Sequence, residues 1–287
     1  MPRFPETELI LTPDKRVYHL NLKAEDIADT VVVVGDQNRV REISKHFNHI
    51  EFKTAHREFI THTGIYKGKR ITVLSTGIGT DNIDIVMNEL DAAVNINPET
   101  RELNPKLRSL NIFRLGTSGS IRKEIPVDSI LVSSHGLGLD GLLPYYIDRK
   151  YNLNELCDTF LKHPEWNGRL PKPYCYEADA DLLDRFSKEA YSGITATAPG
   201  FYGPQGRRLR LEPSVKDLHE VLRTFNYRNL QITNFEMETS ALYGLGKLLG
   251  HRCLTLCVII ANRETLEFTN NYTKSIDKLV EFWLDKI

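Results

Sequence analysis

The sequence predicts an α/β fold, in which a largely parallel or mixed sheet is covered by helices. Short apolar runs alternate with segments of helical periodicity over most of the 287 residues, and this alternation is typical of such sheets. A chain of this length can bury one large core or two smaller ones. Neither a linker nor an internal repeat interrupts the alternation. We therefore expect a single domain over residues 1–287.

Local patterns predict the individual elements. Four consecutive valines at residues 31–34 predict a buried strand, which ends at Gly35 and precedes a helix toward Phe47. Further strands are predicted at residues 71–75, 112–115, 129–133, 194–198, 231–234 and 254–261. Further helices are predicted at residues 83–90, 182–191, 217–225, 237–249 and 276–284. We expect the strand at 112–115 to stop at Gly116, because glycine commonly ends a strand at a turn.

Residues 136–178 break this alternation. The segment is rich in proline and aromatic residues, and loops of this length inside compact domains are usually lids or partner-facing segments. We expect an irregular insertion there.

Composition and charge exclude several classes of protein. Hydrophobic residues make up 41% and charged residues 26%, which is ordinary for a globular protein. With 37 basic and 38 acidic side chains, the chain has no global field to attract nucleic acid or a membrane surface. Its apolar runs are too short to span a bilayer, and the N-terminus lacks an apolar signal. We expect a cytoplasmic protein with no nucleic-acid or membrane partner.

The cysteines predict neither a zinc site nor disulfides, because no two of them form a Cys-x-x-Cys pair. We expect all four to be small core residues: Cys157, Cys175, Cys253 and Cys257.

Two glutamates, Glu236 and Glu238, lie where an apolar run gives way to helical periodicity. At a strand end, residues i and i+2 share a face, and the positive end of a following helix stabilises anions there. Such a pair could accept both hydrogens of a vicinal diol, as in ribose. The spacing also fits two acids that only improve a helix start.

Two glycine turns follow predicted strands and carry an arginine. Gly35 precedes Arg39 by one helical turn, and Arg114 comes just before Gly116 and Thr117. Backbone N–H groups beside a guanidinium suit a phosphate, although each turn alone could be an ordinary one. Neither turn has the spacing of the Walker loop or of the dinucleotide-binding motif.

A third turn combines an aromatic ring, an amide and a guanidinium in Phe201, Gln205 and Arg207. These groups could stack on a planar heterocycle and hydrogen-bond its lactam edge. Arg208 and Arg210 follow directly, so a solvated basic turn is the alternative.

In chain order, these segments resemble the nucleoside phosphorylase superfamily, uridine phosphorylase type. The matching motifs are His19-Leu20-Asn21-Leu22, residues 35–40, His56-Arg57-Glu58-Phe59, residues 75–79, residues 114–117, Leu139-Asp140-Gly141, Phe201-Tyr202 with Gln205 and Arg207, and Glu236-Met237-Glu238. The resemblance implies a single α/β domain on a mixed, partly closed sheet. It also implies a homodimer at least, and some relatives form hexamers.

The resemblance implies three groups of contacts. They are Gly35, Arg39, Arg114, Thr117 and a neighbouring subunit's Arg57 for phosphate; Glu236, Met237 and Glu238 for ribose, with a neighbouring subunit's His19 near its 5' hydroxyl; and Phe201, Gln205 and Arg207 for the base. Arg114, Glu238, Gln205 and Arg207 would be catalytic. Phosphate is a co-substrate, and neither a metal nor an organic cofactor is implied. Some relatives hold a structural cation with a glutamate like Glu58.

The implied activity is phosphorolysis of uridine by a pentosyltransferase of nucleoside salvage. Purine-specific relatives keep an aspartate where this chain has Asn262, which favours a pyrimidine. The alternatives are a purine nucleoside phosphorylase, a hydrolytic nucleosidase, and a non-catalytic nucleoside-binding regulator. The chain departs from the family at Gln37, where a proline is usual, and at residues 80–82.

Overall fold

The computed structural model describes residues 3–164, 166 and 168–287. The chain divides into two compact units. The first comprises Met1–Phe113 and Leu249–Arg252, and the second comprises Arg114–Leu248 and Cys253–Ile287. The predicted single domain over residues 1–287 stays a prediction.

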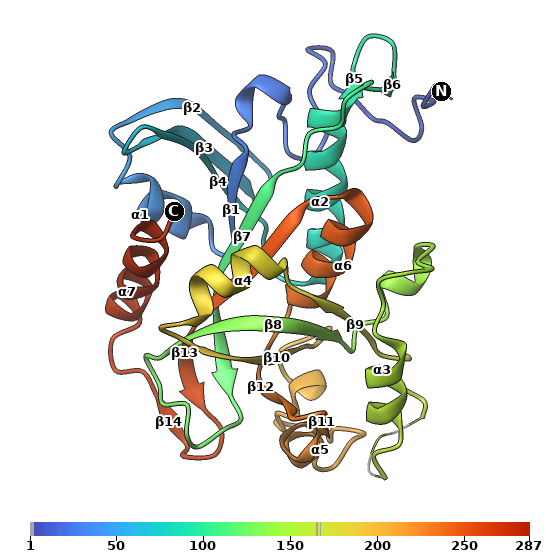
Figure 1. Ribbon diagram of the computed structural model, residues 1–287, viewed down its shortest axis with the longest axis vertical. Coiled ribbons are helices and arrows are strands. Elements are labelled where there is room, and N and C mark those ends of the chain that lie inside the picture. Colours follow the sequence, from blue (N-terminus) through green and yellow to red (C-terminus); the bar gives the residue numbers. More distant parts are fainter. Residues whose placement is uncertain (1–2, 165, 167) are drawn as a thin grey trace. The chain divides into compact units, whose positions relative to one another are not determined.

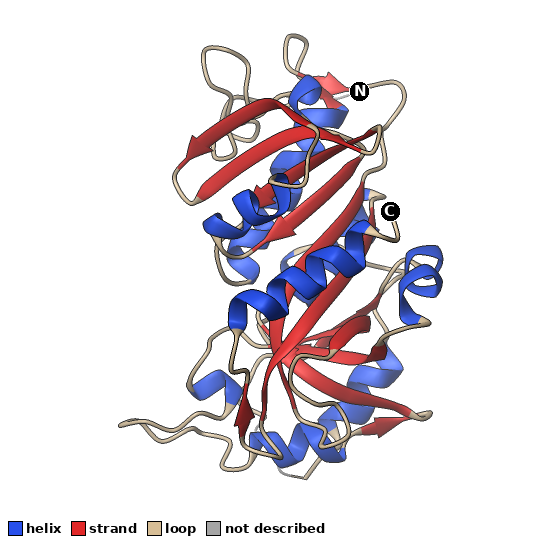
Figure 2. Cartoon of the chain, turned by 90° about the vertical axis from the view of Figure 1, so that its left-hand side faces the viewer, coloured by secondary structure: helices blue, strands red, loops and turns tan. Residues whose placement is uncertain are grey.

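The first unit contains a sheet whose strands follow the order β1-β4-β3-β2. Its elements are η1 (Ala24–Asp26), β1 (Thr30–Val34), α1 (Gln37–Ser44), β2 (His49–His56), β3 (Phe59–Tyr66), β4 (Lys69–Ser75), α2 (Thr80–Asn95), β5 (Ile96–Asn97) and β6 (Glu102–Leu103). β1 and β4 are parallel, whereas β4, β3 and β2 pair antiparallel. The four strands run side by side, and α1 packs on β3 and β4 (Figure 1 and Figure 2).

The valine run forms β1 as predicted, and all four valines are buried. A strand covered on both faces requires this continuous apolar run. Asp36 then caps α1, because its carboxylate accepts a hydrogen bond from the backbone N–H of Asn38. The predicted strand, turn and helix around Gly35 are therefore confirmed.

The second unit contains the remaining strands and helices. They are β7 (Asn111–Ser120, from Arg114 on), β8 (Ile130–Gly138), η2 (Leu143–Tyr145), α3 (Asn154–Leu161), β9 (Tyr174–Glu177), α4 (Ala180–Ser187), β10 (Tyr191–Thr197), η3 (Gly203–Gln205), α5 (Leu218–Thr224), β11 (Asn226–Tyr227), β12 (Leu230–Glu236), α6 (Thr239–Leu249), β13 (Arg252–Asn262), β14 (Glu267–Phe268) and α7 (Tyr272–Leu284).

The sheet of the second unit closes on itself. Its strands follow the order β12-β10-β8-β13-β7, and β7 pairs again with β12. The β8–β10 and β10–β12 pairs are parallel, whereas β13–β8 and β7–β12 are antiparallel. An apolar cluster from β8, β10 and β12 packs against α3 and α5. The predicted α/β class with a mixed, partly closed sheet is confirmed.

Gly116 does not end its strand, because β7 continues to Ser120. A side chain at Gly116 would place its Cβ 2.2 Å from a guanidinium nitrogen of Arg114. The glycine therefore leaves room for the Arg114 side chain, which lies on the same face of the strand. The strand end predicted at Gly116 was wrong for this reason.

The insertion at residues 136–178 contains more regular structure than expected. The end of β8, the helix α3 and the strand β9 all lie within it. α3 buries Leu156, Cys157 and Phe160, and this short apolar stripe is hard to recognise among flanking prolines. Glu165 and Asn167, which belong to the predicted insertion, lie outside the described residues.

All four cysteines are free and buried, which confirms the prediction that they are core residues. In the part of the chain that the structure describes, no helix is both long enough and apolar enough to span a membrane.

Candidate active site

A buried cluster of one arginine and two glutamates lies where the sheet of the second unit closes, at the pairing of β7 with β12. Arg114 lies on β7, Glu236 ends β12, and Glu238 lies just before α6. The pairing of Gly119 with Phe235 joins the two strands. One guanidinium nitrogen of Arg114 lies 3.1 Å from Glu236, and the other forms an ion pair with Glu238. All three side chains are buried.

The cluster holds its arginine firmly in the charged form. Burial disfavours the charge, but the carboxylates of Glu238 and then Glu236 outweigh it and raise the pKa of Arg114. Arg114 also donates a hydrogen bond to the sulfur of Cys257 on β13, at 3.3 Å. The guanidinium therefore has partners from three elements of the unit.

Glu236 caps the helix α6. Its carboxylate accepts hydrogen bonds from the backbone N–H groups of Glu238 and Thr239, at 3.0 and 3.1 Å. It also accepts one from the hydroxyl of Thr197 at 2.8 Å. Both oxygens are engaged, as expected of an acid at a helix start.

Met237 and Thr117 complete the predicted residues of this region. Met237 is half-buried between the two buried glutamates, and Thr117 is half-buried three residues beyond Arg114 on β7. The structure thus places the predicted ribose residues Glu236, Met237 and Glu238 beside one predicted phosphate residue, Arg114.

The three residues predicted to bind the base form a second cluster in the same unit. Gln205 ends η3 and is buried. Arg207 donates hydrogen bonds to the side-chain oxygen of Gln205 and to the backbone oxygen of Phe201. The guanidinium carbon of Arg207 lies 3.8 Å from the centre of the Phe201 ring, which is a cation–π contact.

Arg263 joins this cluster, although no role was predicted for it from the sequence. Its guanidinium donates to the backbone oxygen of Gln205 at 3.3 Å and lies 5.5 Å from the centre of the Phe235 ring. Its position in the sequence could have identified it, because Arg263 directly follows the last residue of β13. Functional side chains often follow strand ends in α/β folds.

The two arginines of the base cluster create a local positive potential. Burial and then the charge of Arg263 lower the pKa of Arg207 to about 10. Burial also lowers the pKa of Arg263. Neither guanidinium forms an ion pair with a carboxylate of the described residues. A planar anion bound here would therefore find unbalanced positive charge.

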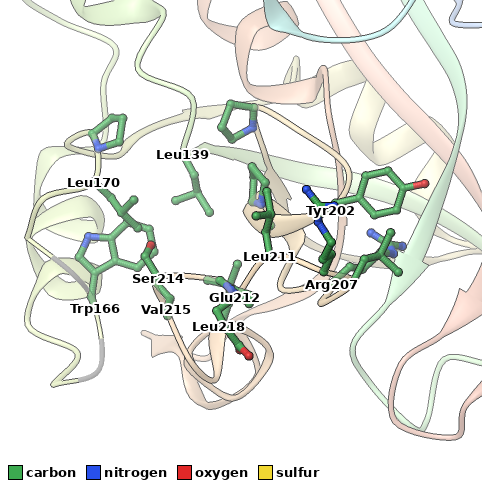
Figure 3. Close-up of a pocket in the computed structure, with 17 residues that line it drawn as sticks. Leu139, Trp166, Leu170, Tyr202, Arg207, Leu211, Glu212, Ser214, Val215 and Leu218 are labelled. Atoms are coloured by element: carbon green, nitrogen blue, oxygen red, sulfur yellow. The ribbon is translucent and has the colours of Figure 1, made fainter.

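A cavity of about 780 Å³ lies beside the base cluster (Figure 3). Tyr202 and Arg207 line one side, and Leu139, Trp166 and Leu170 from the insertion line another. Most of the lining is apolar. The insertion thus forms a wall next to the loop that carries Arg207.

Four predicted site residues lie in the first unit. Gly35 directly follows β1 and lies close to Gly77, since a Cβ at Gly35 would lie 3.3 Å from the Gly77 backbone oxygen. Arg39 is buried within α1. Arg57 is exposed in the turn between β2 and β3, and its guanidinium lies 5.5 Å from the centre of the Tyr18 ring. His19 is half-buried and contacts α2.

Glu58 lies next to Arg57 in the same turn. Among the residues with described positions, no three His, Cys, Asp or Glu side chains are grouped so that they could hold a metal ion. The expectation that no metal is required stays a prediction.

Comparisons with known proteins indicate the family of this chain. Residues 29–285 match the family model of the phosphorylase superfamily. The chain is 30% identical to a uridine phosphorylase of Thermococcus kodakarensis, over 93% of this chain and 84% of that protein. It is 29% identical to a uridine phosphorylase of Haemophilus influenzae, over 90% of each chain. Proteins named purine nucleoside phosphorylase match at 27% and 25% identity.

A solved structure is also similar. The Trypanosoma brucei nucleoside phosphorylase, described as showing uridine phosphorylase activity, has a TM-score of 0.87 and 29% sequence identity. The match covers 97% of this chain and 99% of that one. On the family match and these similarities, the chain belongs to the phosphorylase superfamily.

Proposed function

We propose that this chain is a uridine phosphorylase, a pentosyltransferase that converts uridine and phosphate to uracil and ribose 1-phosphate in nucleoside salvage. The observation that carries the proposal is the base cluster, in which Gln205 lies between two arginines without carboxylate partners. A pyrimidine that departs as an anion needs such a positive environment. The uridine phosphorylases among the similar proteins support the same substrate.

The base would bind through its polar edge. The amide of Gln205 can donate to a uracil carbonyl and accept from N3–H, while Arg207 can donate to the second carbonyl. Phe201 would contact the ring. As the glycosidic bond breaks, negative charge grows on uracil, and the charges of the half-buried Arg207 and Arg263 stabilise it.

Ribose and phosphate would meet at the buried carboxylates. We propose that Arg114 binds phosphate together with Gly35, Arg39, Thr117 and a neighbouring subunit's Arg57. In the structure, Arg114 pairs with Glu238. Phosphate would replace that carboxylate as a partner of Arg114, and Glu238 would then accept the hydrogens of the ribose diol. Met237 would contact the sugar, and Glu236 would contribute by holding this segment in place.

Phosphate would attack C1' as the sugar becomes cationic. Bound phosphate and Glu238 place negative charge beside that cation, while the arginines stabilise the departing base. Each developing charge then has a partner already in position, which is the largest source of catalysis in many enzymes. The proposed reaction uses phosphate as a co-substrate and needs no other cofactor.

We further propose a homodimer at least, with a hexamer as the larger assembly, in the cytoplasm and without nucleic-acid or membrane partners. His19 and Arg57 would serve the neighbouring subunit's site. The exposed position of Arg57 and the partial exposure of His19 support this. The four buried free cysteines suit a reducing compartment.

A purine substrate is the main alternative, and the contacts of Asn262 argue against it. The Asn262 amide donates to the backbone oxygens of Arg122 and Ile125, and its oxygen accepts from Glu264 and Thr265 N–H. This buried side chain is committed to the turn after β13. It can therefore neither protonate a purine nor replace the aspartate of purine-specific relatives.

The test is a substrate panel with purified protein. Uridine, thymidine, inosine and adenosine are each incubated with and without phosphate, and the released base and sugar phosphate are quantified. We expect uracil and ribose 1-phosphate from uridine, only when phosphate is present. Faster release of hypoxanthine would favour the purine enzyme, and phosphate-independent release would favour a hydrolase. Binding of uridine and phosphate without any product would favour a regulator.

A further inference from the structure

The carboxylate of Glu89, on helix α2, gathers three hydrogen-bond donors from the His19 segment. It accepts the backbone N–H of His19 at 2.9 Å and that of Leu20 at 2.8 Å. The Nδ1 atom of the His19 ring lies 2.6 Å from the Glu89 Oε1 atom. Only 16% of the Glu89 side chain is exposed. One half-buried carboxylate therefore holds both the backbone and the ring of His19.

The chemistry of a carboxylate decides which nitrogen of His19 carries the proton. An ionised carboxylate has acceptors only, so its partner at 2.6 Å must be a donor. Nδ1 therefore bears a hydrogen, and in the neutral imidazole the other nitrogen, Nε2, is left as an acceptor. A carboxylate that sets the tautomer and orientation of a functional histidine is a common arrangement in enzymes.

The surroundings of His19 restrict it further. The His56 ring donates from Nδ1 to the backbone oxygen of His19 at 2.9 Å. The ring of Tyr18 packs edge-on against the His19 ring, with 5.0 Å between ring centres. The backbone of the segment and one side of the imidazole are thus held, while 30% of the His19 side chain stays exposed.

We propose that Glu89 is the positioning residue for recognition of the nucleoside 5' hydroxyl. This inference rests on the proposed function, in which His19 reaches the neighbouring subunit's ribose. Glu89 fixes the Nδ1–H tautomer of His19, so that Nε2 accepts the hydrogen of the 5' hydroxyl. Glu89 itself touches no substrate. Without it, the ring is free to rotate, and the tautomer that presents a donor at Nε2 becomes accessible.

The kinetic test compares uridine with 5'-deoxyuridine, which lacks the 5' hydroxyl. For Glu89→Ala we expect kcat/KM for uridine to fall about tenfold, the value of one well-placed hydrogen bond. We expect kcat/KM for 5'-deoxyuridine to fall by less than about twofold, because this substrate has no 5' hydroxyl to contact His19. When His19 is already replaced by alanine, Glu89→Ala should cause no further change in the ratio of kcat/KM for uridine to kcat/KM for 5'-deoxyuridine. Asp84→Asn, on the same helix but bonded to Asn88, is the matched control.

Equal losses for the two substrates would overturn the positioning role and assign Glu89 to stability alone. If the wild-type protein releases uracil from neither substrate, the proposed function fails as well, so the two failures are distinguishable. Nitrogen-15 NMR of the histidine rings supplies a readout that needs no turnover. The resonance lost in His19→Gln should show the Nδ1–H tautomer in the wild type, and an Nε2–H tautomer there would overturn the inference.

Discussion

Arg114 and Glu238 form a buried ion pair between β7 and the segment that leads into α6. The two residues are the proposed partners of different substrates, phosphate and ribose. Each neutralises the charge of the other, and Glu236 adds a second carboxylate at 3.1 Å. The loss of any one member therefore changes the stability of the protein as well as its activity.

Arg114→Met is expected to unfold more easily and to lose phosphorolysis. The variant leaves two buried carboxylates without their guanidinium, and breaking such a buried pair costs about 3–5 kcal/mol. Urea denaturation measures the free energy of unfolding, and uracil release measures activity. The double variant Arg114→Met with Glu238→Gln should recover part of the stability but none of the activity. Wild-type stability in the single variant would contradict the buried pairing.

Glu236 and Glu238 are expected to respond differently to the sugar. Glu238→Ala should lower kcat/KM more for uridine than for 2'-deoxyuridine, because the deoxy sugar lacks one of the two hydroxyls that Glu238 would accept. Glu236→Ala should lower both about equally, since Glu236 is engaged with Thr197 and the start of α6. The loss of this cap should also cost about 1 kcal/mol of stability. A selective loss for uridine in Glu236→Ala would instead assign the diol contact to Glu236.

Arg207→Ala is expected to slow uridine cleavage about a hundredfold, the typical effect of removing one group that stabilises a developing anion. The loss should be smaller for 5-fluorouridine, because its base is a better leaving group and depends less on the arginine. Arg208→Ala is the control, since Arg208 is exposed and paired with Glu212. An equal loss for both nucleosides would show that Arg207 acts on binding and not on the departing base.

The local parts of this site could be predicted from the sequence, and the long-range parts could not. The turn at Gly35 and the strand-to-helix junction at Glu236 follow from neighbouring residues. The division of roles between Glu236 and Glu238 depends on Arg114, which is more than a hundred positions away and arrives only because β7 pairs with β12. Arg263 was missed for the same reason, because it contacts Gln205 from a distant strand end.

The fold shows the same limit. The hairpin of β2 and β3 was not predicted, because β2 alternates only between exposed and half-buried positions, as an edge strand does. The valine run of β1 was found at once, because a strand buried on both faces is apolar throughout. A strand that lacks a clearly apolar face, such as β2, is recognised only when the strand it pairs with is known.

His62, on β3, is expected to make the stability of the first unit sensitive to acid. Burial lowers the pKa of the His62 ring below its usual 6.5, and the charges of Lys53 and Arg41 lower it further. The unfolded chain therefore binds more protons than the folded protein between that lowered pKa and 6.5. The stabilisation from neutral His62 is complete above 6.5 and is lost as the pH falls through this window.

Replacement of His62 should remove part of this dependence on pH. In urea, the wild-type unfolding midpoint should decrease as the pH is lowered from about 7.5 to about 5.5, and His62→Gln should flatten that decrease. The substituted glutamine would keep a hydrogen-bonding group near Ser44, which now lies 2.7 Å from the His62 ring nitrogen. His49→Gln is the control, because the His49 side chain is 63% exposed and should leave the slope unchanged. If the urea midpoint of His62→Gln depends on pH as steeply as that of the wild type, the acid sensitivity does not come from His62 but from other buried histidines.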